Sequence, residues 1–102
     1  MLVPSQDLHE LYALIASLSD AQEAELLLHD LLTPQELQSL SERWQLIQEL
    51  AKGTPQREIA KKLNVSISKI TRGSRMLQYG HGGFRHFLGK AKGVAQSAST
   101  IS

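Results

Sequence analysis

The sequence contains no cysteine, which excludes disulfides, thiolate metal sites and cysteine nucleophiles together. Aromatic residues are few: one tryptophan, two tyrosines and two phenylalanines in 102 residues. No apolar run approaches the roughly 18 residues that cross a membrane. The N-terminal segment "MLVPSQDLHE" also lacks the basic start and apolar core of a signal peptide. We therefore expect a cytoplasmic protein that does not associate with a membrane.

Acidic side chains are almost missing from residues 52–102, and basic ones are almost missing from residues 1–51. The first half holds nine carboxylates and only Arg43, a net charge of −8, whereas the second holds ten Lys/Arg and only Glu58, a net charge of +9. This asymmetry indicates a basic functional surface carried on an acidic scaffold. A polyanion is the natural partner of such a surface, and nucleic acid is the commonest one.

Apolar residues recur at helical spacing along most of the chain, and no stretch alternates as a strand does. The pattern predicts an all-α fold of five or six short helices in a single domain over residues 1–90. Within it we expect dimerisation helices over 5–53, a helix-turn-helix over 55–77 and a last short helix over 84–90. Residues 91–102 are small and polar, and we expect them to form a disordered tail.

Local signals mark where two of these helices begin. Thr33 can cap a helix, Pro34 suits its first position, and Glu36 completes a capping box. Thr54 and Pro55 are placed for the same two roles one helix later. Before Thr33, the run "LLLHDLL" contains more leucine than one face of a lone helix can bury, which favours packing against a second chain.

The stretch "QREIAKKLNVSISKITRGSRML", residues 56–77, meets the requirements of a helix-turn-helix. Ala60 lies where the two helices approach most closely, so a larger side chain would push them apart. Asn64 falls at the turn, where a left-handed backbone is needed and asparagine is the next choice after glycine. The core shared by the two helices is expected to consist of Ile59, Leu63, Val65, Ile67 and Ile70.

Polar and basic side chains remain on the outer surface of this helix pair. Those of the second helix share one face, which suits the major groove, and the basic residues of the first helix are placed for phosphates. The predicted DNA-binding residues are Gln56, Arg57, Lys61, Lys62, Ser66, Ser68, Lys69, Thr71, Arg72 and Arg75. The alternative is a basic helical module that docks an acidic protein partner.

Residues 31–77 resemble the tryptophan operon repressors and their relatives. The resemblance runs from "LLTPQELQSLSERWQLIQEL" through "QREIAKKL" to "ITRGS", and the continuation "LQYGHGGF" is more similar to uncharacterised relatives within that family. It implies an interleaved homodimer with two recognition helices about one DNA turn apart, roughly 34 Å, facing a palindromic operator. It also implies a transcription regulator, in the simplest case a repressor that occupies a promoter.

The resemblance further implies a site for L-tryptophan as corepressor. Family members that sense it hold the indole ring between two arginines, which match Arg43 and Arg72, and bind its polar end with residues that match Leu32 and Thr33. The predicted ligand-binding residues are Leu32, Thr33, Arg43, Arg72, Gly73 and Met76. Met76 replaces a small serine of the tryptophan-responsive members and offers a zwitterion no hydrogen bond. The identity of the effector therefore stays open: it is L-tryptophan, another flat metabolite, or none at all.

The residues alone leave two roles open for each arginine. Arg43 lies at helical spacing among leucines and isoleucine, where a buried charge needs a partner. That partner is either a carboxylate of a second subunit or a flat ligand stacked on the guanidinium plane. Arg72 suits a DNA phosphate as well as it suits a ligand.

No other chemistry is indicated. The four histidines, His9, His29, His81 and His86, do not have the three- or four-residue spacing that places metal ligands on one helix face. No serine or carboxylate pair is placed as a nucleophile or an acid–base couple. We expect no enzyme, no metal site and no cofactor other than the candidate corepressor.

Overall fold

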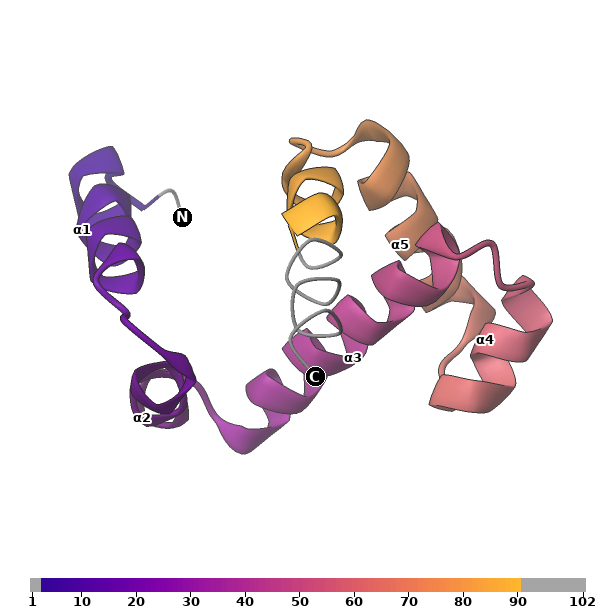
Figure 1. Cartoon of the computed structure of the whole chain (residues 1–102), viewed down its shortest axis with the longest axis horizontal. Helices are drawn as coiled ribbons and strands as arrows, with labels where there is room; N and C mark the ends of the chain where they lie inside the picture. The colour runs from indigo at the N-terminus through magenta and orange to yellow at the C-terminus, as the bar shows by residue number, and fades with distance from the viewer. Residues whose placement is uncertain (1–2, 91–102) are drawn as a thin grey trace, which may run out of the picture. The chain divides into compact units, whose positions relative to one another are not determined.

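The computed structural model describes residues 3–90, which form helices and no strand, so the predicted all-α class is confirmed. The helices are α1 (Ser5–Ala16), α2 (Ala21–Leu31), α3 (Pro34–Ala51), α4 (Gln56–Leu63) and α5 (Ile67–Tyr79), followed by a last helix over residues 83–90 (Figure 1). None of the helices in this range is long and apolar enough to cross a membrane. The predicted tail, residues 91–102, lies outside the described residues.

The chain divides into two compact units, Met1–Gln38 and Ser39–Ser102, and α3 starts in the first and continues into the second. In the first unit, α1 and α2 contain no buried residue. Large apolar side chains of these helices are exposed, namely Tyr12, Leu14, Ile15, Leu26 and Leu31. The part of the first unit that the structure describes, residues 3–38, thus has well-formed helices but no buried core.

The capping box predicted at the start of α3 is confirmed. The backbone N–H of Glu36 donates to Thr33 Oγ1 at 3.1 Å, and the backbone N–H of Thr33 donates to Glu36 Oε1 at 2.8 Å. These hydrogen bonds, the one from the Thr33 backbone first, hold the pKa of the Glu36 carboxyl below its ordinary value. Asp20 caps α2 in the same way, accepting from the backbone N–H of Glu23 at 2.9 Å.

The second unit has its own core, made by residues of α3, α4, α5 and the α4–α5 turn. Its buried apolar side chains are Leu46, Ile47, Ile59, Val65 and Ile70. A Cβ atom at the buried Gly73 would lie 2.9 Å from Leu46 Cδ2, so glycine is what allows α5 to come this close to α3. The ring of Trp44 of α3 stacks on Phe84 of the last helix, with centroids 6.4 Å apart.

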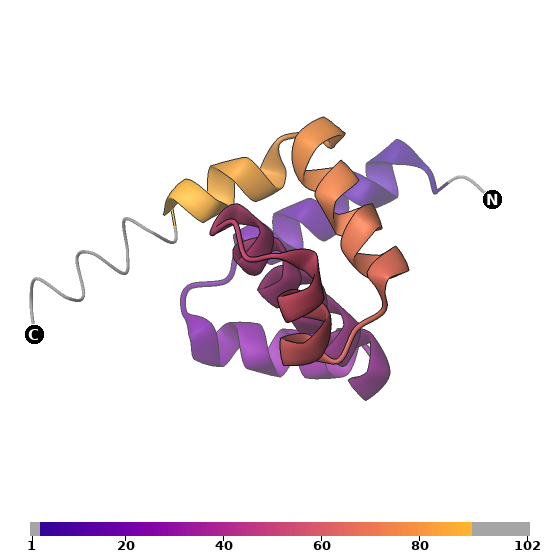
Figure 2. The same ribbon diagram turned by 90° about the vertical axis from the view of Figure 1, so that its right-hand side faces the viewer.

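Figure 2 shows the short turn that joins α4 to α5. The backbone of this turn has the predicted conformation. Asn64 adopts the left-handed conformation with φ of 53°, as the helix-turn-helix requires, and Ala60 is half-buried where α4 meets α5. Ser66 then caps α5, its Oγ accepting the backbone N–H of Lys69 at 3.2 Å. The helix-turn-helix geometry of residues 56–79 therefore follows the sequence signals closely.

Two local predictions for this unit are wrong. Ile67 is 50% exposed instead of buried, because the face of α5 that turns inward carries Ile70 and Gly73. Thr54 does not cap α4, since Pro55 occupies the cap position without a side-chain hydrogen bond. The Thr54 hydroxyl instead donates to Glu49 Oε1 of α3 at 3.0 Å.

Candidate nucleic-acid interface and the adjoining groove

All ten predicted DNA-binding residues are exposed, and they lie on α4, on α5 or at the Ser66 cap. Along α5 the outer face is hollowed, with a shallow cavity of about 350 Å³ lined by Ile67, Ser68, Thr71, Arg72 and Arg75. Hydroxyl and guanidinium groups of this kind bond to base edges and phosphates in a major groove. The exposed face of α5 is therefore chemically suited to DNA.

Ile67 belongs to this face, which the sequence interpretation missed. An exposed apolar side chain at the start of a recognition helix is suited to contact the methyl group of thymine. Its spacing could have indicated this exposure, because Ile67 lies four residues before Thr71 and the two side chains therefore share one side of α5.

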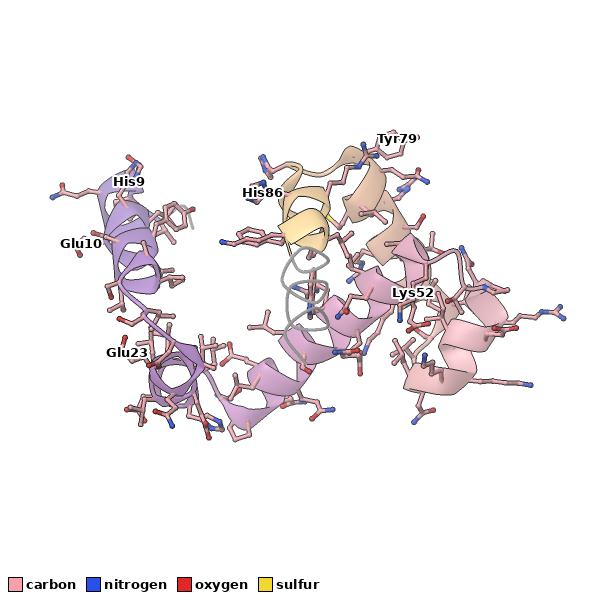
Figure 3. All side chains as sticks on the ribbon, in the orientation of Figure 1. His9, Glu10, Glu23, Lys52, Tyr79 and His86 are labelled. Atoms are coloured by element: carbon pink, nitrogen blue, oxygen red, sulfur yellow. The ribbon has the colours of Figure 1, made fainter. Side chains whose placement is uncertain are left out.

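Lys62 has a second task besides the predicted phosphate contact. Its Nζ lies 3.0 Å from Glu49 Oε2, and the buried Glu49 also accepts from Thr54 Oγ1 and pairs with Lys52 at 3.3 Å. The hydrogen bond from Lys62, followed by the one from Thr54, lowers the pKa of Glu49 to about 2. Lys52, labelled in Figure 3, lies where α3 ends. This cluster fastens α4 to the C-terminal end of α3.

Lys69 is also paired within the chain. Its Nζ lies 2.9 Å from Glu42 Oε1 of α3, so the side chain reaches back to α3 and does not line the hollow on the outer face of α5. By contrast, no carboxylate in residues 3–90 forms a salt bridge with Arg57, Lys61, Arg72 or Arg75. These four uncommitted cations are the groups best placed for phosphates.

A groove of about 350 Å³ runs between α3 and α5. Its walls have matching helical spacing, with Ser39, Glu42, Arg43 and Leu46 from α3, Lys69, Arg72, Gly73 and Met76 from α5, and Phe84 from the last helix. It brings together four of the six predicted ligand-binding residues, Arg43, Arg72, Gly73 and Met76. Leu32 and Thr33 belong to the first unit, where Thr33 caps α3.

The groove has a polar end and an apolar end. Glu42 and Lys69 form their ion pair in the wall at one end, whereas Met76, two turns further along α5, and Phe84 line the other. Arg43 is exposed, so the predicted burial of this charge is wrong for the single chain. It lies one turn before the buried Leu46 and Ile47, beyond the end of the core. Two guanidinium groups are thus available to a flat or anionic molecule.

Comparison with known proteins gives a consistent result. A family model described as Trp repressor protein matches residues 6–92. The chain is 43% identical over 74 residues to a Trp operon repressor homolog from Vibrio parahaemolyticus, covering 72% of each sequence. It is 30% identical over 95 residues to the uncharacterized protein YerC from Bacillus subtilis, covering 93% of this chain and 91% of that protein. The structure of a TrpR like protein from Eubacterium eligens superimposes with a TM-score of 0.82 at 31% identity, covering 85% of this chain and 90% of the other.

Proposed function

Because the chain belongs to the Trp repressor family, whose members are DNA-binding regulators and not enzymes, we propose that it is a sequence-specific transcription regulator acting as a homodimer. In this proposal α5 enters the major groove of an operator, and α4 lies across the phosphate backbone. The observation that carries it is the exposed face of α5, with two uncommitted arginines beside hydroxyl groups.

In this proposal α4 contacts phosphates and α5 contacts base edges. Arg57 and Lys61 of α4 are exposed point charges and would position the protein on phosphates without specifying sequence. Ser68, Thr71 and Arg75 of α5 would meet base edges, and Ile67 would meet a thymine methyl. Occupation of a promoter by such a dimer would repress transcription.

The homodimer is supported by apolar surface that the single chain leaves uncovered. The helices of the first unit bury no residue. The second unit has an apolar cavity of about 440 Å³ whose walls include Trp44, Phe84 and Phe87. Small domains of this size have little margin to leave such side chains in water. A second copy of the chain, interleaved through its α1 and α2, would cover them.

We also propose that the groove between α3 and α5 binds an effector, with L-tryptophan as the first candidate. A ring between the planes of Arg43 and Arg72 would rest on Gly73 at the floor of the groove. Met76 would offer it an apolar contact and no hydrogen bond, so flat metabolites without an amino group are competitors.

The function is tested by titrating fluorescent duplex DNA with the protein at several salt concentrations. Neutralising six to ten phosphates predicts a loss of about 10³–10⁵ in affinity between 50 and 200 mM salt. A module for acidic protein partners would show no preference among duplex sequences. Failure to prefer any duplex from a random pool would overturn the proposal.

The effector is tested by calorimetric titration of L-tryptophan, with indole-3-propionate as the control that lacks the amino group. Saturable binding at one site per chain that is lost in Arg43→Ala would support the groove as its site. If millimolar ligand gives no heat and sedimentation confirms a folded dimer, the groove does not bind L-tryptophan. Arg43 and Arg72 would then contact DNA phosphates or the second subunit.

A further inference from the structure

The ion pair between Glu42 and Lys69 joins two segments that lie 27 residues apart in the sequence. Lys69 Nζ and Glu42 Oε1 are 2.9 Å apart, and the side chains are 58% and 26% exposed. It is the one salt bridge within residues 3–90 that links α3 directly to α5. Its position is informative, because Lys69 stands in the first turn of the helix that we assign to DNA recognition.

Lys69 would be a natural phosphate ligand if its ammonium were not already occupied. Its backbone N–H donates to Ser66 Oγ, which fixes the start of α5, and its side-chain ammonium is held by Glu42. A phosphate that approaches the start of α5 therefore competes with Glu42 for the same cation. The carboxylate would also lie near that phosphate and repel it.

We propose that Glu42 is an intramolecular antagonist of DNA binding, which acts by holding Lys69 away from the DNA backbone. This inference rests on the proposed DNA-binding function. An exposed ion pair contributes at most about 1 kcal/mol, so Glu42 lowers the DNA affinity only modestly, by keeping the Lys69 ammonium on α3 instead of on a phosphate. The same pair lines the groove between α3 and α5, so it links the wall of that groove to the DNA-binding surface.

The consequences are specific. Replacing Glu42 with glutamine frees Lys69, and DNA affinity rises by about two- to fivefold for each recognition helix, the range expected for an exposed pair. Lys69 then neutralises one more phosphate, so the salt dependence steepens by about one for each helix. Lys69 touches no base in this arrangement, so the gain is the same for all duplex sequences.

The experiment compares the wild-type protein, Glu42→Gln, Lys69→Gln and the double variant on one duplex at several salt concentrations. Glu58→Gln is the matched control, since Glu58 is an exposed carboxylate of α4 that forms no salt bridge in residues 3–90. The expected result is tighter binding and a steeper salt slope for Glu42→Gln, and no effect of Glu42→Gln when Lys69 is already replaced. Circular dichroism and sedimentation confirm that each variant is a folded dimer.

Three results would overturn the inference. Weaker binding of Glu42→Gln would make the pair a strut that orients α5. Equal tightening with and without Lys69 would make Glu42 a source of general repulsion, and unchanged binding would give it no role. If the wild-type protein bound no duplex at all, the proposed function would fail instead, and the two failures are thereby distinguished.

Discussion

The two compact units of this chain differ in charge and in what they bury. Residues 1–38 hold seven carboxylates and no lysine or arginine, and their helices α1 and α2 bury nothing. Residues 39–102 hold eleven lysines and arginines and enclose a core that includes Ile47, Ile59 and Ile70. The comparison teaches that the second unit carries its basic surface on a core of its own, whereas α1 and α2 of the first unit leave their apolar side chains uncovered.

The two units also differ in the contacts that hold their helices in place. In the second unit Glu49 pairs with Lys62 and Lys52 and accepts from Thr54, and Gly73 allows α5 to approach Leu46. These contacts fix the angle of the helix-turn-helix on α3. In residues 3–38 the side-chain hydrogen bonds span three or four residues, as in the cap that Thr33 forms with Glu36.

The largest expected effect tests whether the apolar side chains of the first unit pack against a second chain. Ile15→Asp places a charge in the middle of the apolar stripe of α1, where the side chain is 45% exposed in the single chain. We expect the dimer to dissociate and operator affinity to fall by about 100-fold or more, because two linked sites become one. Ala13→Asp places the same charge on the opposite, exposed face of α1 and is the control. Sedimentation of Ile15→Asp as an intact dimer would contradict the expectation.

A change confined to the second unit should spare the dimer and remove DNA binding. Ala60→Leu overfills the half-buried contact between α4 and α5, at a cost of about 1–3 kcal/mol. We expect duplex affinity to fall by more than about tenfold, measured by fluorescence anisotropy, while sedimentation still shows a dimer. Ala51→Leu, at the exposed end of α3, makes the same substitution without crowding. Unchanged affinity in Ala60→Leu would disprove the assigned helix-turn-helix register.

The buried carboxylate of the second unit predicts a pH dependence with a definite sign. The Lys62 contact lowers the pKa of Glu49 from 4.5 to about 2, so the native state favours the ionised form. Its stabilising contribution is fully present above pH 4.5 and is lost as the pH falls towards 2. We expect Glu49→Gln to lower Tm at pH 7 and to approach the wild-type Tm near pH 2, measured by circular dichroism. Glu25→Gln in the first unit is the control, and a Tm difference that does not depend on pH would refute this account.

The smallest effect concerns a single phosphate contact. Lys61→Ala should weaken binding to all duplexes about equally and flatten the salt dependence by about one. Lys62→Ala should weaken DNA binding in the same way, but it should also lower Tm, because Lys62 forms an ion pair with Glu49 and Lys61 does not. Anisotropy titrations at several salt concentrations measure the affinities, and thermal melts followed by circular dichroism measure Tm. A loss of affinity restricted to one base position would make Lys61 a base-reading residue instead.

Sequence interpretation succeeded where the determining contact is local. The capping box of Thr33 and Glu36 spans three residues, and the left-handed turn at Asn64 depends on the steric preference of that one residue. The exposed basic face of α5 followed from helical spacing alone. Such features depend little on what the rest of the chain does.

It failed where a partner comes from a distant segment. Thr54 bonds Glu49 rather than capping α4, and Lys69 pairs with Glu42 across 27 residues. Ile67 fits an apolar pattern as well as Ile70 does, and only the packing of α5 on α3 decides which of them is buried. These pairings depend on how the helices pack, which periodicity does not specify.

The most direct test of the central claim is selection of duplexes from a random pool by the intact protein. A dimer with two recognition helices predicts enriched sequences that are inverted repeats, with half-sites centred about one helical turn apart, roughly 34 Å. Enrichment of unrelated single sites, or no enrichment at a salt concentration where binding is measurable, would contradict the claim that two copies of α5 read an operator together.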